Sequence, residues 1–140
     1  MKKIGVILAF FSLLLVIIPV DSYANPVQQY GSGGWDPQGS DEFTNQSEIF
    51  LSGGGDFKIC LSSDSQSGYY ELYEEDPYNT DDVVYSNGIR GLYFKTAGSN
   101  DFDSNGCHVF KNIGGYVDGD QAEFYLAKYS GGNSTVYAYD

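Results

Sequence analysis

The stretch EFYLAKYSGGNSTVYAY, residues 123–139, decides the fold class. Its two ends, 123–129 and 135–139, are short runs dominated by Tyr, Val, Thr and Phe, which fit the pleated, half-buried surface of a strand. The residues between them, 130–133, are Ser-Gly-Gly-Asn and favour a turn. The stretch therefore predicts two strands joined as an antiparallel hairpin.

The same pattern of short runs between turn residues extends back to Glu42. Phe57, Ile59 and Leu61 recur with a period of two, and Asn87-Gly88 is a hairpin-turn signal. The other runs lie at 49–51, 69–73, 83–85, 92–94 and 109–110. Gly, Ser, Asn and Asp interrupt each window long enough for a helix. The sequence predicts an all-β domain, a single antiparallel β-sandwich or small barrel of about seven or eight strands.

Residues 1–24 show the three zones of a secretory signal peptide. Lys2 and Lys3 form the basic start, 4–20 carries no charge, and Ser22-Tyr23-Ala24 supplies small residues at a cleavage site. Because no basic stop-transfer cluster follows the apolar zone, cleavage is favoured over a membrane anchor. We therefore expect a secreted protein with no stable membrane association after cleavage.

The next segment, residues 25–41, reads NPVQQYGSGGWDPQGSD and is rich in Gly, Ser, Gln and Pro. It offers little apolar surface to bury, which predicts an extended N-terminal arm ahead of a sandwich domain at 42–140. Trp35 is the exception in this arm. Its indole either packs back onto the domain, the reading we favour, or is displayed to a partner.

Cys60 and Cys107 are the two cysteines of the chain. In an exported protein two thiols at separate sites indicate one disulfide. A zinc site would need more Cys or His ligands, and His108 is the single histidine. In the chain-entropy model such a bridge stabilises the fold by about 4 kcal/mol.

The charge balance excludes some partners. With 19 acidic and 7 basic residues the formal net charge is −12. Nucleic acids are bound through Lys and Arg, so a nucleic-acid partner is not expected. An anionic membrane is disfavoured for the same reason.

Asp101-Phe102-Asp103-Ser104-Asn105-Gly106 matches the opening half of a helix-loop-helix calcium loop. The twelfth position is Asn112, where a bidentate Glu is wanted, and no helical pattern flanks the stretch. This is therefore not a standard calcium hand. The alternative is an ordinary Asn-Gly turn in an acidic protein.

A second acidic segment is ELYEEDPYNTDDVV, residues 71–84. Its clustered carboxylates repel one another unless they are spread into solvent or bridged by a cation. The segment is similar to the acidic loop of the calcium-dependent lipid-binding β-sandwich domains, an analogy that would imply a cation bound there. A solvated acidic loop is the alternative.

A third acidic segment, Asp118-Gly119-Asp120, predicts a turn. If calcium is bound, Asp118 and Asp120 could join Asp101 and Asp103 at one end of the sandwich. Calcium is thus the candidate cofactor. Its candidate ligands are the side-chain oxygens of Glu74, Asp76, Asp81, Asp82, Asp101, Asp103, Asn105, Asp118 and Asp120.

The mature chain holds more tyrosines than one small core can use, and we expect some of them to fill gaps in that core. Tyr125 and Tyr129 share one face of a predicted strand, and Tyr137 and Tyr139 share a face of another. A row of tyrosines could stack on sugar rings or form a protein interface, whereas cross-strand packing is the alternative. The candidate binding residues are these four tyrosines and Trp35.

The overall plan resembles the small secreted proteins of Bacillus-type Gram-positive bacteria, many of which have no assigned activity. The shared features are the Lys-Lys start, the Ser-Tyr-Ala cleavage site, the GGWDP segment at 33–37, one cysteine pair and Tyr-rich strands. The resemblance implies secretion and no particular site residue.

These observations predict a secreted, non-catalytic protein that binds a glycan or cell-wall polymer through a Tyr-rich surface. Calcium is a candidate cofactor that would assist this binding. One alternative is a secreted inhibitor or antagonist whose acidic surface binds a basic protein. A second is a small carboxylate-dependent hydrolase. An enzyme is disfavoured because the chain has one His, no G-x-S-x-G or phosphate-binding motif and little room for a deep cleft.

Overall fold

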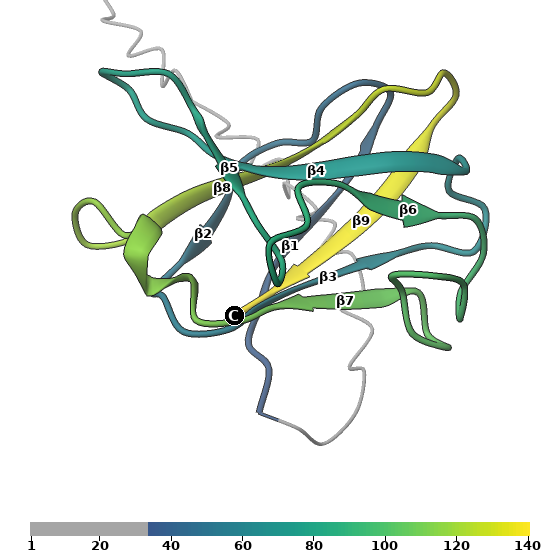
Figure 1. The fold of residues 1–140 in the computed structure, drawn as a ribbon, viewed down its shortest axis with the longest axis horizontal. Coiled ribbons are helices and arrows are strands. Elements are labelled where there is room, and N and C mark those ends of the chain that lie inside the picture. The colour runs from purple at the N-terminus through teal and green to yellow at the C-terminus, as the bar shows by residue number, and fades with distance from the viewer. Residues whose placement is uncertain (1–33) are drawn as a thin grey trace, which may run out of the picture.

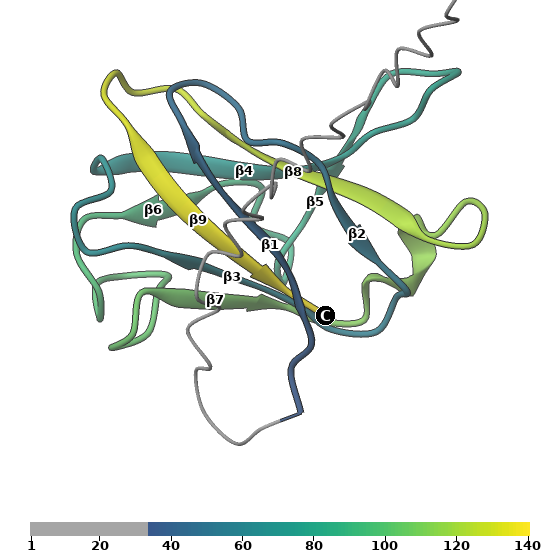
Figure 2. The same cartoon turned by 180° about the vertical axis from the view of Figure 1, so that it is seen from behind.

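The computed structural model describes residues 34–140, which form two antiparallel β-sheets packed face to face (Figures 1 and 2). The predicted signal peptide at 1–24 and the first part of the predicted arm lie outside the described residues. The elements are β1 (Pro37–Phe43), β2 (Phe50–Ser52), β3 (Phe57–Leu61), β4 (Gly68–Glu74), β5 (Asp82–Val84), β6 (Leu92–Phe94), β7 (Cys107–Phe110), the 3-10 helix η1 (Ile113–Tyr116), β8 (Ala122–Lys128) and β9 (Ser134–Tyr139).

One sheet has the strand order β1-β9-β3-β7. The other has the order β2-β8-β4-β5, and β6 pairs with β4 beside β5. Strand β8 pairs with one edge of β4, and the other edge is shared: β5 pairs with its Leu72–Glu74 end and β6 with its Gly68–Tyr70 end. The predicted all-β antiparallel sandwich is confirmed, with nine strands in the described residues.

The additional strand is β1, which begins at Pro37 inside the segment expected to be an arm. It pairs with β9 from Pro37 to Phe43, with a register shift between Pro37 and Gly39. The Gly, Ser and Pro composition gives this segment little strand propensity of its own. Backbone pairing with β9 supplies the order instead, so the folded domain starts before Glu42.

The expected hairpin between β8 and β9 is wrong, because these two strands lie in different sheets. Residues 129–133 therefore cross from one sheet to the other. Lys128, only 4% exposed, donates from Nζ to the carbonyl oxygens of Ser130 and Gly132. This buried ammonium group satisfies carbonyls of the crossing that a hairpin ladder would otherwise have paired.

Phenylalanine fills the space between the sheets. Every described phenylalanine is buried, and Phe50, Phe57, Phe94, Phe110 and Phe124 are at most 1% exposed. In this central cluster Tyr70 is the tyrosine present, and its hydroxyl lies 2.6 Å from Ser134 Oγ. The core is thus built mainly from phenylalanine and aliphatic side chains, and most tyrosines are left for the outer faces of the sheets.

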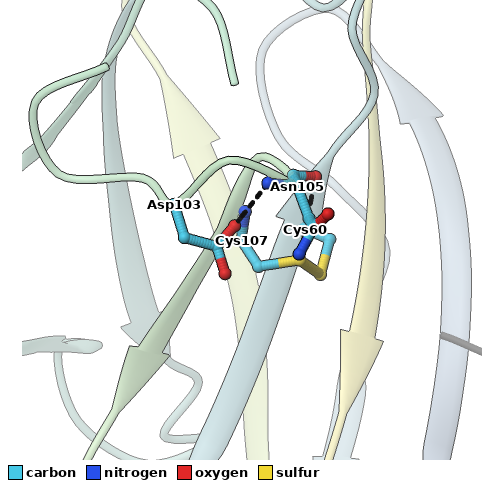
Figure 3. Close-up of a disulfide and its surroundings, with 4 residues drawn as sticks. All are labelled: Cys60, Asp103, Asn105 and Cys107. Atoms are coloured by element: carbon cyan, nitrogen blue, oxygen red, sulfur yellow. Dashed lines mark hydrogen bonds between the residues drawn. A yellow bond between two sulfur atoms is a disulfide. The ribbon is translucent and has the colours of Figure 1, made fainter. Parts of the chain in front are cut away.

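The disulfide between Cys60 and Cys107 is confirmed (Figure 3). The two cysteines stand opposite each other in the pairing of β3 with β7, so the bond fastens an edge strand to its neighbour. Asp103 Oδ1 accepts the backbone N–H groups of Asn105 and Cys107 and thereby shapes the turn that leads into β7. Among residues 34–140, no helix has the length and apolar character needed to cross a bilayer.

Candidate functional site

A groove lies over the outer face of β4 and β8. Tyr69, Glu71 and Tyr73 alternate with buried residues along β4 and so point away from the core. Ala127 of β8 lies between Tyr125 and Tyr129 in the sequence, and its small side chain lines the groove. The groove has a volume of about 760 Å³ and is lined by Asn45, Gln46, Tyr73, Thr80, Asp81, Tyr125, Ala127, Lys128, Tyr129, Ser130 and Gly131.

Three tyrosines give this groove its aromatic surface. Tyr73 and Tyr125 are opposite each other in the pairing of β4 with β8. Their rings are stacked, with centroids 5.3 Å apart and planes within 6° of parallel. Tyr125 is 9% exposed and forms part of the wall, whereas Tyr129, just beyond β8, is 69% exposed. The structure thus brings the predicted Tyr125 and Tyr129 together with Tyr73, which was not predicted.

A hydrogen-bond network fixes two of these rings. The Tyr73 hydroxyl donates to Glu71 Oε2 over 2.6 Å, and the Tyr129 hydroxyl donates to the same oxygen over 3.0 Å. Arg90 forms an ion pair with Glu71, its Nε lying 2.9 Å from Oε1. Partial burial alone would raise the pKa of Glu71, but hydrogen bonds from Tyr73, Arg90 and Tyr129 outweigh it and lower the pKa.

The third ring is held by an acidic residue of the β4–β5 loop. The Tyr125 hydroxyl donates to Asp81 Oδ2 over 2.6 Å. Burial, followed by this hydrogen bond and the charge of Asp81, raises the pKa of the Tyr125 phenol. Asp81, predicted as a cation ligand, therefore lies in the groove wall, where its carboxylate accepts a hydrogen bond from the Tyr125 hydroxyl.

The other predicted aromatic residues lie on the opposite sheet. Lys58, 8% exposed, places its Nζ 4.6 Å from the centroid of Trp35 and 4.4 Å from that of Tyr139. Trp35, Tyr137 and Tyr139 pack against the disulfide. The indole thus packs back onto the domain, as favoured from the sequence. Burial lowers the pKa of Lys58, while the negative charge of Asp103 opposes that change.

A second cluster lies at one end of the sandwich, where β4 ends and β8 begins. Carboxylate oxygens of Glu74, Asp118 and Glu123 lie within 4.8 Å of one another. Glu74 is 4% exposed and its Oε1 is buried without a hydrogen-bond partner. Burial, then the charges of its acidic neighbours, raises the pKa of Glu74 to about 7; these neighbours are Asp118, Asp76, Glu123 and Asp82.

Glu123 was missed by the sequence analysis. It entered only as the start of a strand, because a lone Glu in a strand run carries no metal-binding signal. The pairing of β4 with β8 brings Glu123 close to Glu74, because Glu74 lies opposite Phe124, the residue that follows Glu123. None of the three clustered acids lines the groove.

The remaining predicted ligands do not join this cluster. The loop between β6 and β7, which carries Asp101, Asp103 and Asn105, lies at the other end of the sandwich from the connection before β8 (Figure 1). Asp101 Oδ2 accepts the backbone N–H of Tyr93 over 2.8 Å. Asp76 accepts from the backbone and side chain of Asn79, the latter over 2.8 Å. Asp82 and Asp120 are exposed.

Ser86 and His108 form a contact that the sequence did not indicate. Ser86 Oγ lies 2.8 Å from His108 Nε2, and His108 Nδ1 lies 2.6 Å from the carbonyl oxygen of Asp101, to which it can donate. Ser86 is 5% exposed and sits at the Asn87-Gly88 turn, where its backbone bridges Ile89. The contact ties this turn to β7, and the buried hydroxyl is poorly placed to meet a substrate.

Comparison with known proteins gives two matches. A family model described as the YndA coiled coil domain matches residues 35–138. The uncharacterized protein YndA of Bacillus subtilis (strain 168) is 36% identical over an alignment of 140 positions, which covers 96% of each chain. No solved structure matches. The words "coiled coil" do not describe the fold found here, because residues 34–140 contain no α-helix.

Proposed function

The chain belongs to the family of the YndA coiled coil domain, and we propose that it is a secreted, non-catalytic protein that binds a glycan or cell-wall polymer. Because the matched relative is uncharacterized, the proposal is argued from the groove. The observation that carries this proposal is the tyrosine-lined groove across β4 and β8. The resemblance to small secreted Bacillus-type proteins agrees with the Bacillus origin of the relative.

The chemistry of the groove suits a sugar chain. A pyranose ring has an apolar C–H face that stacks on an aromatic ring, and hydroxyls at its rim that need hydrogen-bond partners. Tyr129 offers an exposed ring, and Asn45, Gln46 and Thr80 offer polar groups at the edges. A volume of about 760 Å³ is enough for a small saccharide unit.

The groove is also held rigid before any ligand arrives. Glu71 fixes the hydroxyls of Tyr73 and Tyr129, and Asp81 fixes that of Tyr125. Rings that are already ordered lose little side-chain entropy on binding. This rigidity favours binding, and the absence of Glu74, Asp118 and Glu123 from the groove lining gives a hydrolytic function less support.

A second candidate is an antagonist of a basic protein. The β4–β5 loop carries Asp76, Tyr78 and Asp81, and Asp82 begins β5; the side chain of Tyr78 is 92% exposed. An exposed aromatic ring surrounded by negative charge suits a cationic protein surface.

Retention on insoluble cell-wall glycan tests the proposal. The purified protein should stay bound at about 1 M salt, where the Debye length is about 3 Å and charge attraction is screened. Tyr129→Ala removes the exposed ring, and Ala127→Leu fills the groove without removing a hydrogen bond. Both variants should reduce retention about fivefold, since one stacking contact contributes on the order of 1 kcal/mol and each variant removes or blocks one contact.

Tyr78→Ala is the matched control, because it removes an exposed tyrosine outside the groove. It should leave glycan retention unchanged. Salt-sensitive capture of a cationic protein that is lost in Tyr78→Ala and kept in Tyr129→Ala would support the second candidate instead. Equal glycan retention by the parent protein and both groove variants, with their melting midpoints preserved, would reject the groove as the binding site.

A further inference from the structure

The cluster of Glu74, Asp118 and Glu123 has the features of a cation site, and we propose that it binds a calcium ion. The proposal does not depend on the glycan-binding function, because the cluster lies outside the groove. It concerns three acids, of which the sequence singled out two in separate segments and missed the third.

The spacing of the oxygens fits one ion. Ca²⁺ binds carboxylate oxygens at about 2.3–2.6 Å, so two oxygens on the same ion lie at most about 5 Å apart. The carboxylate oxygens of these three side chains lie within 4.8 Å of one another. A single calcium ion can therefore contact all three without a rearrangement of the strands.

Glu74 supplies an independent reason to expect a ligand. Its side chain is 96% buried, and its Oε1 has no hydrogen-bond partner. A buried acceptor without a partner is costly, and a buried carboxylate without a counter-charge costs more. A bound cation would supply both the missing contact and the missing charge.

The surroundings contain negative charge and no paired base. Asp76 and Asp82 add to the negative field at Glu74. Within residues 34–140, Arg90 and Glu71 form the one ion pair in which a Lys or Arg nitrogen lies 4 Å or less from a carboxylate oxygen. No Lys or Arg of the described part therefore neutralises the cluster at that distance.

The site is open on one side. Asp118 is exposed and belongs to the Asp118-Gly119-Asp120 turn, whereas Glu123 is half-buried and Glu74 is buried. Calcium takes six to eight oxygen ligands in flexible geometry, and water can complete the shell on the exposed side. Magnesium demands a regular octahedron at shorter distances, which makes calcium the better match.

A thermal melt of the purified protein in EDTA and then in calcium tests the proposal. Extracellular calcium modules bind with dissociation constants of about 0.1–1 mM. At about 10 mM calcium and constant ionic strength, the melting midpoint should rise by about 5–10 °C. Calorimetric titration should show one ion per chain. Asp118→Asn, a change at an exposed position, and Glu74→Gln should each remove the rise.

Asp120→Asn is the matched control, because it removes the same charge from the same turn at a residue outside the cluster. It should keep the calcium-dependent rise. An unchanged midpoint of the parent protein at about 10 mM calcium would overturn the site. So would a rise in Asp118→Asn equal to that of the parent protein, which would show binding elsewhere.

Discussion

Gly106 lets two backbone segments meet beside the disulfide. Its φ is +76°, and a Cβ built on it would lie 2.6 Å from the carbonyl oxygen of Leu61. We predict that Gly106→Ala lowers the free energy of unfolding by about 2 kcal/mol or more, because both the left-handed φ and the clash with backbone oppose the methyl group. Chemical denaturation measures the loss.

Gly115→Ala provides the comparison for that experiment. A Cβ at Gly115 meets nothing within 4 Å, and its φ lies outside the left-handed range. This variant should change the unfolding free energy by less than about 0.5 kcal/mol. If both alanine variants were equally stable, the close approach at Gly106 would not be a structural requirement.

The buried acid Glu74 gives stability a distinctive pH dependence in EDTA. Its pKa is about 7 in the folded chain and close to its usual 4.5 when unfolded, so the folded state holds the proton longer. The stabilisation is complete below about pH 4.5 and is lost as pH rises through about 7. We predict a loss of roughly 2–3 kcal/mol between pH 5 and pH 8.

Glu74→Gln isolates this contribution, because glutamine cannot ionise. Urea denaturation at several pH values should show the decline in the parent protein and a much flatter profile in Glu74→Gln. Carboxylates with lowered pKa values, such as Asp64 and Asp76, have the opposite effect: the stability that they contribute is lost as the pH falls below about 5. A parallel decline in the two proteins would mean that Glu74 is ionised in the folded state.

At this scale the sequence predicted residue types better than residue roles. The Asp-x-Asp-x-Asn-Gly segment was read either as half of a calcium loop or as an ordinary turn; in the structure its acids accept backbone N–H groups and its glycine serves a close contact. The same letters suit a calcium loop and a tight turn, because both require short oxygen side chains and a residue with positive φ. Only the fold distinguishes these uses.

Strand β7 is an edge strand, and the disulfide joins it to β3. The bond spans a sequence separation of 47 residues. Replacing Cys60 and Cys107 by alanine should therefore destabilise the domain by about 4 kcal/mol in the chain-entropy model. Hydrogen exchange should show Cys107–Phe110 losing protection first, because an edge strand has a partner on one side alone.

Reducing agent is the internal control for this prediction. It should lower the melting midpoint of the parent protein and leave the double-alanine variant unaffected. A double-alanine variant within about 1 kcal/mol of the parent protein would show that the β3–β7 pairing holds without the bond.

Eight strand-like runs in the sequence correspond to β2 through β9, since each run has enough Tyr, Phe, Val, Ile or Leu to show its character locally. Strand β1 was not predicted, because its residues, PQGSDEF, include almost none of these strand-forming residue types. The turn at Asn87-Gly88 was predictable, since Asn87 and Gly88 both have positive φ, at 51° and 80°.

At the scale of the whole molecule, both candidate sites depend on pairings between distant segments. Strand β4 pairs with β8, which brings Tyr73 to Tyr125 and Glu74 to Phe124. Sequence patterns report periods of two residues and do not report which strands become neighbours. For that reason the tyrosine pattern grouped Tyr125 and Tyr129 of one predicted strand with Tyr137 and Tyr139 of another as candidates, although β9 lies in the other sheet.

The family description and the fold lead to opposite expectations for the whole chain, and circular dichroism separates them. A coiled coil needs apolar residues every 3.5 positions through several heptads, in segments that keep helix propensity. Residues 34–140 are instead nine strands interrupted by glycine, and each sheet buries Phe against the other. We predict a β-type far-ultraviolet spectrum for the folded protein, with its helical signal below about 10% of residues. A spectrum dominated by α-helix would contradict the sandwich, and with it the groove and the cation site, since both are built from the register of β4 with β8.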